Sequence, residues 1–255
     1  MAFYSLPKEE RILLTEKIGK EIFSDIKTGR EKNILRYFSD EDTYIRKAGY
    51  LAIGRIYHAT DTFRKAIIKQ ITSLLDHDVA KVRQTAVNAA GEIAMKDFMI
   101  VENLFHKGLF DEHHSVRNAV IGSMKKAGEK NPKPVLSFAK KYLDHPDKEI
   151  RREICHGIEL RGRTHPQDIL PLLRKLQHDK TSRVRNTLVH VLGQIAYKKG
   201  CLETVIADLN SWENKELVLD AVEEIIDVHY RYRNFSVLTQ DEAREYIEAQ
   251  LSIRD

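Results

Sequence analysis

An arginine recurs at nearly constant spacing along this chain of 255 residues. It stands at Arg46, Arg83, Arg117, Arg151 and Arg185, which gives successive intervals of 37, 34, 34 and 34 residues. An aliphatic residue precedes each arginine, and a polar turn precedes the aliphatic residue. A fixed period of this length is typical of repeat proteins, in which each unit buries its apolar face against the next unit. This regularity limits the chain to a repetitive architecture.

Five segments align on this arginine, and a sixth is degenerate. The five copies cover residues 39–56, 76–93, 111–124, 144–160 and 178–195. In the sixth copy, residues 211–228, Val218 takes the place of the arginine. Terminal repeats are often atypical, so this substitution is consistent with the end of an array.

Each copy predicts an amphipathic helix. An Asp, Ser or Thr at the preceding turn can cap the helix, and Val82, Ala86 and Ile93 fall on one helical face. Glycines such as Gly54, Gly91 and Gly193 permit close approach of neighbouring helices, although glycine costs helix propensity by up to about 1 kcal/mol. Second amphipathic stretches lie between the copies, at residues 63–75, 134–143 and 169–177.

Sustained period-two alternation of β-branched residues is not found in the sequence, so a sheet is not expected. We predict an all-α fold, a right-handed α-α superhelix built from stacked helix pairs. The predicted single domain covers residues 1–255. It consists of an N-terminal helical cap (1–38), five to six repeats (39–228) and a C-terminal helical cap (229–255).

The acidic turn, the Val-Arg pair and the Ala-x-x-Ala-Gly pattern resemble HEAT repeats over about residues 39–228. This resemblance implies an armadillo-like helical solenoid. It does not imply a particular function, because such arrays serve many binding roles.

The repeated arginines have a structural interpretation that we favour over a binding role. Asp40, Asp111 and Asp179 stand six residues before Arg46, Arg117 and Arg185, and histidines take this place in the other two copies. Such pairs can satisfy turn groups and polar groups of the neighbouring repeat, and so form a spine between units. Arg151 and Arg185 can serve both purposes.

Charge is segregated along the chain although the net charge is only +4. Residues 148–199 hold 12 Lys/Arg and 5 Asp/Glu, a balance of +7, whereas residues 201–255 hold 5 and 13, a balance of −8. A basic surface of this kind suits a nucleic-acid backbone or an acidic protein segment, and a merely solvated surface is the alternative. The candidate nucleic-acid-binding residues are Arg151, Arg152, Arg161, Arg163, Lys180, Arg183, Arg185, Lys198 and Lys199.

The sequence patterns that could form a catalytic or metal site are not specific. Cys155 and His156 are adjacent in a helical pattern and point about 100° apart, so they do not form a nucleophile and its base. Cys155, His156 and His165 lack the spacing of a zinc site, and we expect Cys155 to be a small buried apolar residue. We therefore predict no catalytic residue, no metal and no small-molecule cofactor.

Two aromatic and basic segments, Tyr197–Gly200 and residues 229–235, could contact nucleic acid, but we favour the interpretation that their rings cover the core.

The two cysteines are 46 positions apart without a C-x-x-C pair, which suits a reducing compartment. No apolar run approaches the roughly 18–20 residues needed to span a bilayer, and charged residues precede any signal-like segment. We predict a cytoplasmic protein without a membrane partner.

The segments EIRREICHGIELRGRTHP and ILPLLRKLQHDKTSRVRNTLVHVLGQIAYKKG resemble the HEAT-like DNA alkylation-repair family, also called alkylpurine DNA glycosylase-like. The resemblance implies a basic concave face that holds duplex DNA, and in some members excision of cationic alkylated bases. Those members use a carboxylate, tryptophans and an arginine. Here Arg152 takes the arginine position, but Arg117 stands for the acid, and His113 and His190 stand for the tryptophans.

Replacing the acid by Arg117 reverses the local charge, and the chain has one tryptophan, Trp212. A cationic base needs aromatic faces and a carboxylate for its stabilisation. The sequence therefore favours a non-catalytic HEAT-repeat module that binds the DNA backbone. A protein–protein interaction scaffold is the first alternative, and a glycosylase with an altered site is the second.

Overall fold

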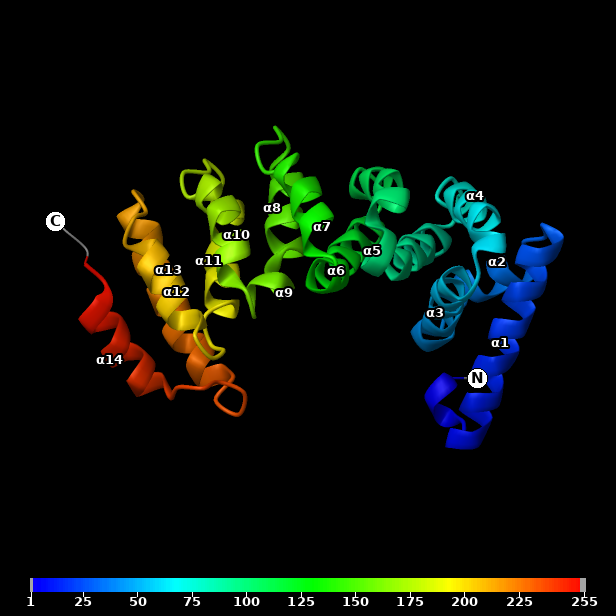
Figure 1. The fold of residues 1–255 in the computed structure, drawn as a ribbon, viewed down its shortest axis with the longest axis horizontal. Helices are drawn as coiled ribbons and strands as arrows, with labels where there is room; N and C mark the ends of the chain where they lie inside the picture. The colour runs from blue at the N-terminus through cyan, green and yellow to red at the C-terminus, as the bar shows by residue number, and fades with distance from the viewer. Residues whose placement is uncertain (1, 253–255) are drawn as a thin grey trace. The chain divides into compact units, whose positions relative to one another are not determined.

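The computed structural model describes residues 2–252, and in this range every regular element is a helix. The fold is the predicted all-α, HEAT-like repeat solenoid, without strands among the described residues (Figure 1). The chain divides into two compact units, Met1–Asn131 and Pro132–Asp255. No helix in the described range is long and apolar enough to cross a membrane.

The first unit packs helix against helix in sequence order. Contacts join α1 to α3, α3 to α5, α4 to α5 and α5 to α6. The long helix α5 has a kink at Asp97, where the backbone leaves helical geometry (φ −121°, ψ 53°), so it comprises the second helix of one repeat and the first of the next. The elements are η1 (Phe3–Ser5), α1 (Lys8–Thr28), α2 (Lys32–Phe38), α3 (Thr43–Ala59), η2 (Asp61–Phe63), α4 (Arg64–Leu74), α5 (Ala80–Leu109) and α6 (His114–Lys130).

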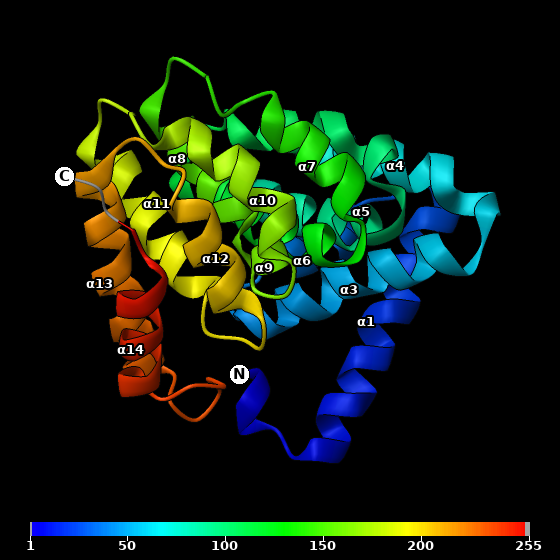
Figure 2. The same cartoon turned by 60° about the vertical axis from the view of Figure 1, so that its left-hand side comes forward.

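The second unit has two layers of helices. Helix α11 contacts α8 and α13 in one layer, and α10 contacts α12 in the other (Figures 1 and 2). The buried faces of both layers supply aliphatic side chains to the core. The elements are α7 (Pro132–Lys140), α8 (Lys148–Gly157), α9 (Glu159–Gly162), α10 (Pro166–Leu173), η3 (Arg174–Leu176), α11 (Ser182–Gln194), α12 (Cys201–Leu209), α13 (Lys215–Arg231) and α14 (Gln240–Gln250).

The repeated arginine closes the turn that precedes its own helix. The Nη1 atom of Arg83 donates to the carbonyls of His77 and Asp78 at 2.9 and 3.0 Å, and that of Arg117 donates to the carbonyls of Asp111 and Glu112 at 2.7 and 2.9 Å. Arg46 and Arg151 make both equivalent bonds, and Arg185 makes one, to the carbonyl of Asp179. The structural role of these arginines at the turn is therefore confirmed for all five copies.

The residue six positions before each arginine completes the turn. Its side chain accepts a hydrogen bond from the amide two residues further on, as Asp111 Oδ1 does from His113 at 2.8 Å. His77 and His145 do the same through Nδ1, at 3.0 and 3.1 Å. This shared acceptor geometry explains why aspartate and histidine alternate at this position, because both carry an acceptor that reaches the same amide.

Where the turn carries an aspartate, the arginine of the preceding repeat can also bind it. Arg83 pairs with Asp111 through Nε and Nη2 at 2.7 and 2.9 Å, and Arg151 pairs with Asp179 in the same bidentate way at 2.5 and 3.0 Å. Burial acts to raise the pKa of Asp179, but hydrogen bonds from Arg151 and the Thr181 amide outweigh it, so this pKa lies below its usual value. These pairs tie successive repeats together.

Glycine permits close packing at one position of the repeat, eight residues after the arginine. A Cβ atom on Gly91 would lie 2.4 Å from Ser123 Oγ, and one on Gly193 would lie 2.6 Å from Glu224 Cγ. Gly54 is equally close to Glu92. The predicted role of these three glycines in close helix approach is therefore confirmed.

Candidate functional site

Helices α8 and α11 present a polar face on the side of their layer that is not packed into the core. We define the α8–α11 face as Arg152 and His156 of α8 with Arg183, Asn186 and His190 of α11. The three α11 residues follow one another at intervals of three and four, so they share one helical side. Buried residues such as Val184 and Leu188 occupy the opposite side of α11.

This face is hollowed into a surface cavity of about 380 Å³. The volume lies in the range of small-molecule sites, roughly 300–1,000 Å³. All seven lining side chains can donate hydrogen bonds, and none is a carboxylate. They are Arg152, His156, Ser182, Arg183, Asn186, Thr187 and His190.

One carboxylate holds the two arginines of the cavity together. Glu149 accepts from Arg152 Nε at 2.9 Å and lies 3.1 Å from Arg183 Nη1 on the neighbouring helix. Arg152 is mostly covered and also contacts Glu153 at 3.4 Å. Arg183 remains 65% exposed, so it is the arginine of this cavity that is most available to a ligand.

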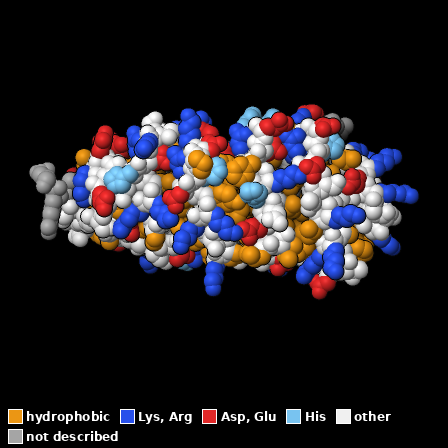
Figure 3. Space-filling model, turned by 90° about the horizontal axis from the view of Figure 1, so that it is seen from above, with side chains coloured by type: hydrophobic (Ala, Val, Ile, Leu, Met, Phe, Trp, Pro, Cys, Tyr) orange, Lys and Arg blue, Asp and Glu red, His pale blue; other side chains and the backbone are white. Residues whose placement is uncertain are grey.

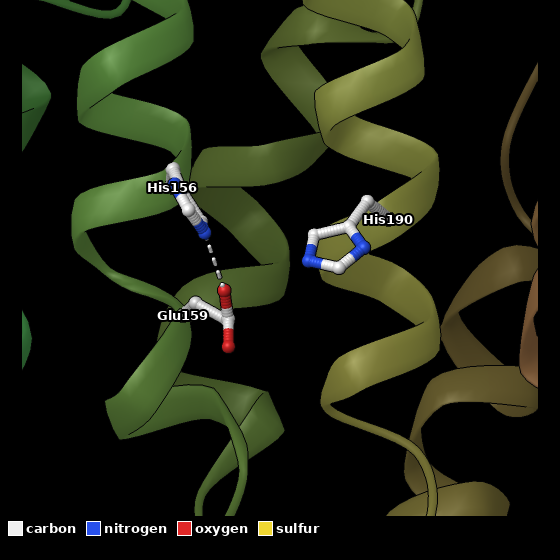
Figure 4. A group of neighbouring side chains, drawn as sticks. All are labelled: His156, Glu159 and His190. Atoms are coloured by element: carbon white, nitrogen blue, oxygen red, sulfur yellow. Dashed lines mark ion pairs between the residues drawn. The ribbon is translucent and has the colours of Figure 1, made fainter. Parts of the chain in front are cut away.

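A buried carboxylate lies beside the cavity. Glu159, 1% exposed, accepts from Arg163 at 2.6 and 3.0 Å and pairs with His156 Nε2 at 3.0 Å (Figure 4). Arg163 also donates to Gln194 at 2.8 Å. Glu159 stands eight residues after Arg151, at the repeat position where three other copies carry the closely packed glycines.

The structure places the nine predicted nucleic-acid-binding residues in two classes. Five arginines make intramolecular bonds: Arg151 with Asp179, Arg152 with Glu149, Arg161 with Asp168, Arg163 with Glu159, and Arg185 with the carbonyl of Asp179. The other four, Lys180, Arg183, Lys198 and Lys199, are exposed, although Arg183 also pairs with Glu149.

The four exposed cations form two groups rather than one. Lys180 and Arg183 stand at the start of α11, whereas Lys198 and Lys199 follow its end. A helix of 13 residues separates the groups by about 20 Å. Only the group that includes Arg183 adjoins the cavity.

The acids of the basic stretch, residues 148–199, are all paired with its own arginines, and the balance of +7 remains. Each of the five acids between residues 148 and 199 pairs with an arginine of the same stretch. Acids of the following segment also contact this stretch, since Asp208 pairs with Arg174 at 3.2 Å and Glu224 lies 3.5 Å from His190. In Figure 3, positive and negative side chains are interspersed over the face of each unit.

Of the other chemical candidates, the two cysteines and Tyr197 belong to the core. Cys155 and Cys201 are free thiols, both buried, and burial raises the pKa of each thiol above its usual value. Tyr197 is buried and stacks on Tyr232, with ring centroids 5.2 Å apart. These findings confirm the structural interpretations of Cys155 and of the Tyr197 segment. In the segment 229–235, Tyr230 and Phe235 are exposed, so the interpretation that the rings cover the core is wrong for these two residues.

The single tryptophan and two of the residues aligned with a glycosylase site, His113 and Arg117, also have structural partners. Trp212 is buried, and its indole N–H donates to Asp208 at 2.6 Å, so its ring faces are not available to a substrate base. His113 caps α6 by accepting from the Ser115 amide, and Arg117 closes the turn before α6.

The sequence interpretation missed Glu159 and His190 as neighbours of His156. The available signal was the repeat itself, because His156 and His190 both stand five residues after the repeated arginine. Equivalent positions of adjacent repeats lie side by side on neighbouring helices. His156 and His190 are 34 residues apart, so the short spacing of common metal motifs does not connect them.

Two family models match the sequence. The model described as non-SMC mitotic condensation complex subunit 1 matches residues 22–161, more than half of the 255 residues. The chain belongs to this family. The model of HEAT repeats matches residues 136–224, and it includes both α8 and α11. This HEAT-repeat chain has no match among curated proteins.

Solved structures show the same fold at low identity. AlkD2 from Streptococcus mutans is 18% identical, with a TM-score of 0.55 over 80% of this chain and 97% of that chain. A structure of crescerin, which uses a TOG domain array to regulate microtubules in the primary cilium, is 14% identical, with a TM-score of 0.50 over 88% and 91%. These likenesses concern the fold alone.

Proposed function

We propose that this HEAT-repeat chain is a non-catalytic binding module that holds the phosphate backbone of nucleic acid at the α8–α11 face. The observation that carries the proposal is the cavity, because all seven lining residues are hydrogen-bond donors and none is an acid. Phosphate contacts in nucleic-acid complexes come from this set of groups: Arg and Lys, Ser, Thr and Asn, and helix N-termini.

The start of α11 supplies several of these groups together. Ser182 begins the helix, Arg183 projects into solvent, and Lys180 lies two residues before the helix. The helix N-terminus adds a partial positive charge and amide donors that favour an anion. Arg183 is held near Arg152 by Glu149, which reduces the entropy lost when both guanidinium groups bind a phosphate.

The proposal does not include base excision. A glycosylase needs a carboxylate and aromatic faces for a cationic base, whereas Trp212 is in the core and the cavity lining lacks an acid. We expect the chain to release no methylated purine from alkylated DNA under conditions in which a positive-control glycosylase is active.

The test measures binding of a short, fluorescently labelled DNA duplex. Fluorescence anisotropy gives the affinity at several salt concentrations. We expect the Lys180→Gln/Arg183→Gln variant to lose about tenfold or more in affinity and to show a shallower salt dependence, since each lost phosphate contact reduces the slope by about one. A variant with wild-type affinity and slope would contradict the proposal.

The matched control is Lys133→Gln/Lys140→Gln, which removes the same charge from exposed positions on α7 in the other layer. It should bind as the wild type does.

The Lys198→Gln/Lys199→Gln variant tests how far the bound nucleic acid extends along α11. A loss confined to long duplexes is expected, because these lysines lie about 20 Å from the cavity end of the helix.

A second candidate function, a scaffold for an acidic amphipathic helix, is favoured by a groove in the first unit. After the kink at Asp97, Met99 and Ile100 are exposed. The groove has a volume of about 560 Å³ and combines apolar and basic side chains. Its lining residues are Tyr57, Arg64, Lys65, Ile68, Lys69, Asp97 and Ile100. The matched family description also names a subunit of a complex.

A synthetic helical peptide with leucine and glutamate on one face tests this candidate. Binding that is lost in Ile68→Asp/Ile100→Asp but kept in Lys180→Gln/Arg183→Gln would support the scaffold. Absence of peptide binding by the wild-type chain would remove it, and DNA binding measured on the same proteins separates the two functions.

A further inference from the structure

Three side chains with metal-ligating atoms converge on the α8–α11 face. His156 lies in the last turn of α8, Glu159 begins α9 and His190 lies on α11. Figure 4 shows both imidazole rings beside the carboxylate. One ligand atom from each residue lies within 4.8 Å of the others. The two rings have centroids 5.8 Å apart and are nearly perpendicular.

The donor set suits a transition metal. Two imidazole nitrogens with one carboxylate oxygen are the protein ligands of many Zn²⁺ sites, and such sites keep a further position for water or a ligand. Zn–N and Zn–O bonds of about 2.0–2.2 Å place tetrahedral ligand atoms about 3.4 Å apart. His156 and His190 are 32% and 44% exposed, so their rings can rotate by the small amount that closes this distance.

Two of the three ligands also have a partner that orients them. Glu224 lies 3.5 Å from His190 Nδ1, which leaves Nε2 to face the group. Arg163 holds one oxygen of Glu159, while the other oxygen faces His156. Metal-bound histidines and carboxylates are commonly oriented in this way, and such partners fix the tautomer and the ring orientation.

The surrounding charge permits a cation. Arg152 and Arg183 share Glu149, and Arg152 also contacts Glu153, so these two guanidinium charges are balanced by two carboxylates. Glu159 balances Arg163. On helix α13, two carboxylates, Glu224 and Asp227, pair with one guanidinium, that of Arg231.

We propose that His156, Glu159 and His190 form a binding site for one Zn²⁺ ion, with an open coordination position directed at the cavity of the α8–α11 face. Repeat architecture brings the ligands together. The two histidines occupy the same register in adjacent repeats, and the carboxylate occupies the register that is glycine in three other copies. The site shares His156 and His190 with the cavity lining, but its test uses the metal alone, so its failure and the failure of nucleic-acid binding are distinguishable.

The test uses the untagged chain of 255 residues after treatment with chelator. Zn²⁺ binding is measured by titration calorimetry, and Co²⁺ serves as a probe because its visible absorption reports tetrahedral coordination. We expect one site per chain and a spectrum of nitrogen and oxygen ligation. Affinity should be lower in acid, because protons compete with the metal for its ligands.

Substitutions of the ligands and of their partners should weaken Zn²⁺ binding to different extents. His190→Ala should weaken Zn²⁺ binding by more than about 100-fold, and Glu224→Gln, which changes only the orienting group, by about 10–100-fold. His178→Ala is the matched control, because His178 pairs with Glu213 at 3.1 Å in the same unit but has no third ligand in the metal-ligating group. It should leave affinity unchanged.

Two results would overturn the site. One is wild-type binding no tighter than that of His190→Ala, and the other is equal loss in His178→Ala and His190→Ala. Because His190 is on the surface, its alanine variant should unfold at the wild-type urea concentration in the absence of metal. Addition of Zn²⁺ should then stabilise the wild type and not the variant.

Discussion

Arg151 and Arg152 are adjacent in α8, yet they belong to two different regions of the molecule. Arg151 binds the turn of its own repeat and Asp179 of the next, as Arg83 binds its own turn and Asp111. Arg152 lines the cavity of the α8–α11 face and is held by Glu149 beside Arg183. One region repeats with the period of the fold, and the other occurs at a single place in it.

The difference teaches where to look for function in a repeat protein. Positions that recur, such as the arginine, the turn acceptor and the glycine eight residues later, are explained by stacking of the units. Glu159 departs from this pattern, because it puts a buried carboxylate where Gly54, Gly91 and Gly193 pack in other copies. We interpret such departures as the functional part of the array.

The largest expected effect is on the recurring region. Asp179→Ala removes the acceptor of a nearly buried bidentate pair and should lower the free energy of unfolding by about 3–5 kcal/mol, since Arg151 would remain without its carboxylate. Urea unfolding measures this loss. Asp144→Ala, which breaks an exposed pair with Lys175, should cause no measurable change. Equal effects of the two variants would refute the assigned role of the turn aspartate.

A smaller effect is expected at the packing glycine. Gly91→Ala places a methyl group against Ser123 and should cost about 1–3 kcal/mol. Gly122→Ala, in helix α6 with open space around it, should stabilise by up to about 1 kcal/mol through helix propensity. Thermal unfolding of both variants checks the opposite signs, and two shifts of the same sign would contradict the packing argument.

Acidification should weaken the recurring region further. The folded pKa of Asp179 lies below the unfolded value of about 3.9, so its ionised form stabilises the fold above about pH 4, and this contribution is lost as pH falls through the folded pKa. Asp179→Asn should flatten the acid limb of a plot of unfolding free energy against pH. An unchanged limb would mean that this carboxylate does not contribute.

The smallest effect concerns the cysteines. Cys155 and Cys201 are buried, and burial raises the pKa of both thiols, so the native chain should react with a chromogenic disulfide reagent only on the timescale of unfolding. Two thiols should react at once in denaturant. Rapid labelling of a thiol in the native chain would place that cysteine outside the core.

Much of this fold could be predicted from the sequence, because the same pattern occurs in five copies and each copy supports the interpretation of the others. Five copies determine the helix pairs, the arginine turns and the close glycines, and Cys155 follows from its place on an apolar helix face. The cavity could not be predicted in this way, because it depends on side chains that meet across helices. Pairing of Arg161 with Asp168 and of Arg163 with Glu159 removes cations that the local charge balance counts as available.

The affinity of the natively folded Arg183→Ala chain for a short DNA duplex tests the central claim most directly. Arg183 is exposed at the cavity and lies outside the recurring arginine, turn and glycine positions, so its loss should not alter the turn bonds or the core. We predict about a tenfold loss of affinity, equivalent to about 1.4 kcal/mol, with an unchanged free energy of unfolding. Wild-type affinity in this variant would contradict the assignment of the α8–α11 face.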